Sequence, residues 1–207
     1  MSDDESHPSI IELKPGSFIY TKSAALSLTL CDEIVDRFEA HPDQHYIGRI
    51  GQRAESQPGI KRSTDLRISG RADWRDVDRQ LFRSLSDALS EMSITHPFFR
   101  VNSFQDIGYN LQRTNPDEYY DWHIDSGPGE FSQRQLVAIW YLNDVPGPGG
   151  ETQFYFHDLS VQPERGKLLL FPPFWTHLHR GNKVASTIKY IATTWVSFAP
   201  TQSSGSK

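Results

Sequence analysis

The feature that most constrains the fold is a change of sequence pattern near residue 100. Before it, apolar residues recur at helical spacing in two segments, from Leu30 to Phe38 and from Trp74 to Leu89. After it, short runs rich in aromatic and β-branched residues are separated by turn residues. This order favours antiparallel strands, because a parallel sheet needs strands and helices in alternation. We therefore expect a mainly β jelly roll with two supporting helices.

The individual elements follow from local signals. Asp73 is expected to cap the second helix at its N terminus. The strands are expected in the runs FFRVNSFQDIGYNLQR, LVAIWYLND, ETQFYF, GKLLLFP and TIKYIATTWVSF. At 207 residues the chain suits one domain. We expect this domain over residues 9–200, with helical support in 9–99 and the jelly-roll core in 100–200, between a disordered tail at 1–8 and a flexible end at 201–207.

Composition excludes several function classes. A net charge of -5 argues against generic nucleic-acid binding, which needs a basic surface. Cys31 is the only cysteine, so neither an internal disulfide nor a thiolate cluster can form, and a metal would need nitrogen and oxygen ligands. The polar start and the lack of a long apolar run predict a cytoplasmic protein with no membrane span.

Two segments contain candidate metal ligands. In YYDWHID, strand alternation would point His123 and Asp125 to the same face, although a lone His-x-Asp is more often a hydrogen-bonded or solvated pair. The run FWTHLHRG supplies a third ligand, from either His177 or His179. Two imidazoles and one carboxylate suit a non-haem Fe(II) oxygenase. Zinc is the alternative metal, but the helical His-x-x-x-His of many zinc hydrolases is absent.

The order of six segments resembles the Fe(II)- and 2-oxoglutarate-dependent dioxygenases, particularly the prolyl 4-hydroxylase-like branch. These segments are YYDWHID, IWYLND, GPGGETQF, PERGKLLLFP, THLHRG and IKYIATTW, within residues 104–198. The resemblance implies a double-stranded β-helix, which is a cupin-like jelly-roll barrel buttressed by N-terminal helices. It also implies Fe(II), 2-oxoglutarate as co-substrate and O2, with ascorbate as an optional reductant.

The resemblance assigns the three iron ligands. His123 and Asp125 match the family's His-x-Asp. His179 is preferred over His177 as the distal ligand, because a basic residue follows the family's distal histidine by nine or ten positions and Lys189 follows His179 by ten. The two histidines are expected on one face of the same strand. The HRG that begins at His179 also resembles the family's His-x-Gly.

The same resemblance assigns the co-substrate site. Lys189 would bind the far carboxylate of 2-oxoglutarate, with Arg180 as the rival cation, and Tyr141 would donate its hydroxyl to the same carboxylate. Where the family often has another tyrosine, Gln112 or Thr114 would substitute. Strand alternation places Lys189, Ile191, Thr193 and Trp195 on one face, toward the barrel interior.

The implied reaction is hydroxylation of a C–H bond with release of succinate and CO2. Asp125 favours this outcome, because related halogenases replace that carboxylate with a small residue. The expected substrate is a peptide or protein side chain, or a small molecule. The candidate recognition loops are residues 45–75, which carry seven basic and three acidic residues, and 126–135.

Two other function classes stay open from the sequence. One is a non-catalytic jelly-roll binding module, and the other is a zinc-dependent hydrolase. Of the aromatics before the His-x-Asp, Tyr119 shares the parity of the ligands and is expected near the substrate, whereas Trp122 is expected in packing. The oligomeric state is not predicted.

Overall fold

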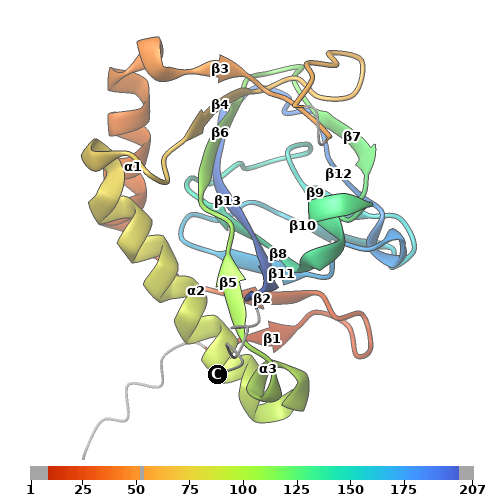
Figure 1. Cartoon of the computed structure of the whole chain (residues 1–207). Helices are drawn as coiled ribbons and strands as arrows, with labels where there is room; N and C mark the ends of the chain where they lie inside the picture. Colours follow the sequence, from red (N-terminus) through yellow and green to blue (C-terminus); the bar gives the residue numbers. More distant parts are fainter. Residues whose placement is uncertain (1–8, 52–53, 201–207) are drawn as a thin grey trace, which may run out of the picture.

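Two antiparallel sheets form the body of the protein, with the helices on one side of the larger sheet (Figure 1). A computed structural model describes residues 9–51 and 54–200. The predicted tails at 1–8 and 201–207 lie outside the described residues. The expected fold class, a mainly β jelly roll with supporting helices, is confirmed.

The larger sheet carries most of the strands. In spatial order it contains β1 (Ile11–Glu12), β2 (Tyr20–Lys22), β11 (Leu168–Phe171), β8 (Arg134–Tyr141), β13 (Lys189–Phe198), β6 (Asn110–Thr114), β4 (Thr64–Arg67) and β3 (Tyr46–Ile47), with β5 (Phe104–Asp106) paired to β13. The smaller sheet contains β10 (Leu159–Val161), β9 (Thr152–Phe154), β12 (His179–Gly181) and β7 (Tyr120–His123).

Both faces of the larger sheet are buried at its centre. In β8, Ala138 and Trp140 belong to the core under the helices, whereas Val137, Ile139 and Tyr141 belong to a second core together with Phe154 of the smaller sheet. Strand alternation therefore sends neighbouring residues into two different cores. This explains why the central strands are continuous apolar runs in the sequence.

Two long helices cover the outer face of the larger sheet (Figure 1). Helix α1 (Leu28–Ala40) begins at Ser27, whose hydroxyl accepts a hydrogen bond from the Leu30 amide at 3.2 Å, and it buries Cys31, Ile34 and Phe38. Helix α2 (Arg75–Thr95) buries Val77, Leu81, Ser84, Leu85, Ala88 and Met92. Within residues 9–51 and 54–200, no helix is long and apolar enough to cross a membrane.

Two predicted boundaries are wrong. Asp73 does not cap α2, because residues Ala72–Trp74 form a 3₁₀ turn that runs directly into the helix, and Trp74 occupies the N-cap position without a side-chain bond. The segment FFRV, predicted as the start of a strand, belongs to helix α3 (Pro97–Val101). Pro97 begins this helix, since its fixed φ suits a first helical turn. Its aromatic residues were mistaken for a strand signal.

A hydrogen-bonded serine joins α2 to the sheet and offers a test of the fold. The Ser84 hydroxyl accepts from Trp140 Nε1 at 2.9 Å and donates to the Ala25 carbonyl at 2.8 Å. Ser84→Ala leaves the buried Trp140 Nε1 and the partly buried Ala25 carbonyl without that bond, so we expect the free energy of unfolding to fall by about 1–3 kcal/mol in denaturant titrations. The matched control is Ser86→Ala, an exposed position on the same helix, where a change within about 0.5 kcal/mol is expected.

Candidate metal centre

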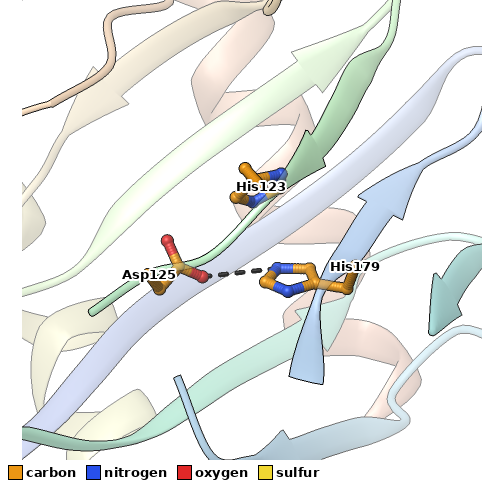
Figure 2. A group of neighbouring side chains, drawn as sticks. All are labelled: His123, Asp125 and His179. Carbon is orange, nitrogen blue, oxygen red and sulfur yellow. Dashed lines mark ion pairs between the residues drawn. The ribbon is translucent and has the colours of Figure 1, made fainter. Parts of the chain in front are cut away.

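Pairing between two short strands brings the three predicted ligands together. β12 pairs with β7 in the register that sets His179 opposite His123, and Asp125 follows two residues after His123. One ligand atom from each of the three side chains lies within 4.8 Å of the others. His179 Nε2 and Asp125 Oδ2 are 3.3 Å apart, as the dashed line in Figure 2 shows. We call these three residues the triad.

Asp125 is held by backbone contacts and not by a strand. β7 ends at His123, so the expected strand clip covers only its first member. The amide groups of Asp125 and Ser126 both donate to the Pro173 carbonyl at 3.0 Å, and Arg134 Nη1 donates to the Asp125 carbonyl at 2.8 Å. These bonds join the segment after β7 to the one before β12, and they fix the Asp125 carboxylate beside the imidazoles.

Backbone carbonyls orient both imidazole rings of the triad. His123 Nδ1 lies 2.7 Å from the Asp121 carbonyl oxygen, and His179 Nδ1 lies 2.9 Å from that of His177. Since a carbonyl only accepts, each Nδ1 carries the proton and each Nε2 keeps a free lone pair. Metal-bound histidines are commonly oriented in this way.

His177 does not belong to the triad. It lies in a 3₁₀ turn (Trp175–His177) before β12, so the expectation that His177 and His179 share a strand face is wrong. Its Nε2 lies 2.8 Å from the Ser17 carbonyl, and its Nδ1 lies 2.9 Å from Thr176 Oγ1. The side chain of His177 is therefore used in structural bonds, while its backbone orients His179.

The electrostatics of the triad suit metal binding. Burial and the neighbouring His179 imidazole together lower the pKa of His123 to about 3, against the opposing effect of the Asp125 carboxylate. Burial alone would raise the pKa of Asp125, but the adjoining imidazoles of His179 and His123 and the Arg134 guanidinium bring it below its usual range. At neutral pH, His123 is uncharged and Asp125 is ionised, which are the forms that bind metals.

A cavity of about 70 Å³ adjoins the triad and contains the predicted lysine. Lys189, 4% exposed, lines this cavity with its register partner Thr114, and its Nζ donates to the Gly150 carbonyl at 2.9 Å. Burial lowers the pKa of Lys189 to about 8, against the opposing effect of the Glu151 carboxylate. Ile191, Thr193 and Trp195 line the same cavity, as strand alternation predicts.

Other predicted residues are less directly placed. Among the described residues that line the cavity, Gln112 and Thr114 are present but Tyr141 and Arg180 are not. The Tyr141 hydroxyl lies 2.7 Å from Thr152 Oγ1, and Thr152 lines the cavity. Tyr141 therefore stands behind Thr152, a residue that the sequence did not indicate.

The aromatic residues before His123 have three different positions. Tyr119 lines the cavity, as expected. Trp122 packs against the Tyr155 ring at 5.3 Å and under the Arg180 guanidinium at 4.5 Å, away from the cavity. Tyr120, which sequence reasoning passed over, stacks on the His123 imidazole with a centroid distance of 3.4 Å.

The cavity continues into a groove of about 590 Å³. Its walls include residues 49–51, 54, 55 and 57 and residues 124–128, 131 and 134, so both predicted recognition loops reach it. The second loop contains a 3₁₀ turn (Gly129–Gln133). The residues that line both the cavity and the groove are Lys61, Gln112, Tyr120, Asp125 and Trp195. Lys189 lines the cavity and not the groove.

Sequence reasoning missed Lys61 at this junction and its ion-pair partner Asp65. From the sequence, Lys61 and Asp65 contribute only to the net charge of a loop. In the structure both side chains are buried and form an ion pair. The available signal was their alternation with Ser63 in KRSTD, which would place the three side chains on one strand face.

Comparison with known proteins agrees with this geometry. Residues 109–197, which carry the whole triad and Lys189, match the model of the 2OG-Fe(II) oxygenase superfamily. A search of curated proteins finds no match.

Several solved structures share the fold at low sequence identity. A viral collagen prolyl hydroxylase from Paramecium Bursaria Chlorella virus-1, solved with 2OG, is 18% identical with a TM-score of 0.67, over 91% of this chain and 100% of that one. A prolyl hydroxylase from Trichoplax adhaerens, in complex with a hypoxia inducible factor peptide fragment, is 16% identical with a TM-score of 0.74, over 88% and 84%. A Pseudomonas putida prolyl-4-hydroxylase is 18% identical with a TM-score of 0.66, over 88% and 94%.

The matched segment and the triad within it lead to the same assignment. Two imidazoles on neighbouring strands and one carboxylate from the segment after β7 form the donor set that suits Fe(II), and the family model covers all three residues. Residues 109–197 match the 2OG-Fe(II) oxygenase superfamily, and the triad within them is the donor set of a 2-oxoglutarate-dependent iron dioxygenase with the fold of the prolyl hydroxylases.

Proposed function

We propose that this dioxygenase hydroxylates a C–H bond of a peptide-borne side chain, with His123, Asp125 and His179 as its iron ligands and Lys189 as the anchor for 2-oxoglutarate. One observation carries the proposal: the triad lines a cavity together with a buried lysine, and its member Asp125 also lines an open groove. The co-substrate would thus bind in the cavity, and the substrate would approach the metal from the groove.

The triad fits Fe(II) by its donor chemistry. Each imidazole has its Nδ1 proton directed to a carbonyl, so Nε2 is the available donor, and the Asp125 carboxylate is ionised. Three protein ligands leave further coordination positions for small molecules. When bound, iron and 2-oxoglutarate supply an oxidant for unactivated C–H bonds, with succinate and CO2 as products.

The remaining residues of the cavity would bind and orient 2-oxoglutarate and exclude water. The Lys189 ammonium would pair with the far carboxylate of 2-oxoglutarate. Burial disfavours the charged form of Lys189, and the negative charge of that carboxylate would stabilise it. Thr114 and Thr152 supply hydroxyl groups beside it, and Tyr141 holds Thr152 in place. Tyr120 and Trp195 provide apolar walls that exclude water from the reacting face.

The groove supports a peptide as the substrate. Its volume of about 590 Å³ and its two walls from separate loops suit an extended chain more than a single free amino acid. Two proteins of the same fold are described as a collagen prolyl hydroxylase and as a prolyl hydroxylase with a bound peptide. Peptidyl proline is therefore the first substrate to test. A cytoplasmic location is part of the proposal, because the only cysteine is buried and unpaired.

The ligand assignment predicts different effects for two neighbouring histidines. His179→Ala removes a donor from the triad, so we expect Fe(II) affinity to fall by more than about 100-fold, and Asp125→Ala should behave likewise. His177→Ala keeps the backbone carbonyl that orients His179, so metal affinity should stay within about tenfold. Anaerobic titration with Fe(II) and 2-oxoglutarate, followed by visible absorption, measures both. Loss of binding in His177→Ala alone would reverse the assignment.

The role of Lys189 predicts a pH dependence of co-substrate binding. Its pKa of about 8 in the free protein means that the ammonium is lost as pH rises through 8. Because only the charged form pairs with a carboxylate, the dissociation constant of 2-oxoglutarate should rise about tenfold per pH unit above that value. Lys189→Met should abolish the dependence and weaken binding at pH 7 by about 100-fold. A constant that does not vary from pH 7 to pH 9.5 in the wild type would contradict the role.

The reaction itself is tested by product analysis. We expect blocked peptides with a central proline to stimulate the release of succinate. The peptide should gain about 16 mass units, which corresponds to about one oxygen atom for each succinate released. Asp125→Ala serves as the inactive control. Stimulation by free amino acids without any by peptides would replace the peptide with a small-molecule substrate.

A further inference from the structure

A second buried lysine lies at the junction of cavity and groove. Lys61 is 4% exposed, and its backbone forms an isolated antiparallel bridge with Tyr120 of β7. The Asp121 amide donates to the Ile60 carbonyl at 2.8 Å, which extends this contact along β7. Lys61 is thus brought beside the triad by a segment about 60 residues earlier in the chain, and it lines both hollows.

The Lys61 ammonium is neutralised by one carboxylate. Its Nζ lies 2.8 Å from Asp65 Oδ2, and the Ser63 hydroxyl donates to the other carboxylate oxygen at 2.6 Å. Both members of the ion pair have side chains no more than 5% exposed. A buried ion pair is seldom stabilising, because both charges lose their hydration. The position of this pair beside the triad points to a role in binding.

The backbone makes room for this side chain. A Cβ added at Gly48 would lie 2.2 Å from Ser63 Oγ and 3.0 Å from Lys61 Cε. The Gly48 amide also donates to the Ser63 carbonyl at 2.9 Å, so the close approach is fixed by a hydrogen bond. Any larger residue at position 48 would displace the Ser63 hydroxyl and crowd the Lys61 side chain.

The Lys61 ammonium has more N–H donors than hydrogen-bond acceptors among the described residues. A lysine carries three N–H donors. Within the part of the chain that the structure describes, Asp65 is the one hydrogen-bond acceptor of Lys61 Nζ, and the Tyr120 ring centroid lies 5.3 Å away. Two donors therefore remain at a point where a substrate entering from the groove must pass.

We propose that Lys61 binds a backbone carbonyl oxygen of the peptide substrate and so positions the residue next to it at the triad. This inference rests on the proposed function. Because Asp65 cancels its charge, Lys61 offers directional N–H bonds without the net attraction that would select a carboxylate. A neutral carbonyl is the acceptor that fits, and every peptide bond supplies one.

The test uses the full chain with iron and 2-oxoglutarate bound, and N-acetylated, C-amidated pentapeptides with a central proline as the probe. Lys61→Met should raise the KM of the peptide at least about tenfold, since a hydrogen bond to a charged group is lost, and leave the affinity for iron and 2-oxoglutarate unchanged. The control is Lys22→Met, which breaks a partly buried lysine pair between Lys22 of β2 and Glu91 of α2. Its KM should equal that of the wild type.

Two further comparisons separate binding from folding. Lys61→Met/Asp65→Leu removes both charges together, so it avoids an unpaired buried carboxylate and should show the same rise in KM. Peptides in which one bond beside the proline is replaced by an (E)-alkene lack the carbonyl. One of them should lose affinity for the wild type by the same factor as Lys61→Met, with no additional loss in that variant.

The outcomes are distinguishable. An unchanged KM in both Lys61 variants overturns the role of Lys61 and leaves the peptide substrate intact. Loss of iron or 2-oxoglutarate binding in the paired variant would make Lys61 part of the cofactor site, which also overturns the inference. If the wild type oxidises none of the peptides but does oxidise free amino acids, the proposed function and this inference both fail.

Discussion

The pairing of β12 with β7 is the constraint on which the site depends. Its register sets His179 opposite His123, and neither strand contains more than four residues. Such short strands are weakly held by their own hydrogen bonds. The Pro173 carbonyl and the Arg134 guanidinium reinforce them by fixing the segment that carries Asp125. Ligand placement is thus a property of backbone contacts around the strands as much as of the strands themselves.

The larger sheet supplies the rigid part of the molecule. β8 and β13 lie at its centre with one face against the helices and the other against the smaller sheet. Lys189 begins β13, so the cation that faces the cavity is attached to the most buried framework. The groove, in contrast, is walled by loops. In many enzymes a rigid scaffold positions the loops that contact the substrate.

Local sequence patterns predicted the elements whose formation depends on local interactions. Apolar spacing located both long helices, and the His-x-Asp with its distal partner located the triad. Predictions were wrong at Asp73 and at FFRV, where a 3₁₀ turn and a proline-initiated helix replaced the expected structure. Lys61 was missed for a different reason. Its place beside the triad depends on a bridge to Tyr120, and no pattern within the segment reports a contact at that distance.

The bond between His177 and Ser17 links the metal centre to the first turns of the described chain. The residue that orients His179 is itself held by a carbonyl 160 positions earlier. Contacts of such sequence separation form late in folding, because a long loop must close first. During synthesis, the Ser17 carbonyl can therefore meet His177 only after most of the described residues have been made. The orientation of His179 through His177 thus depends on residues from both ends of the described chain.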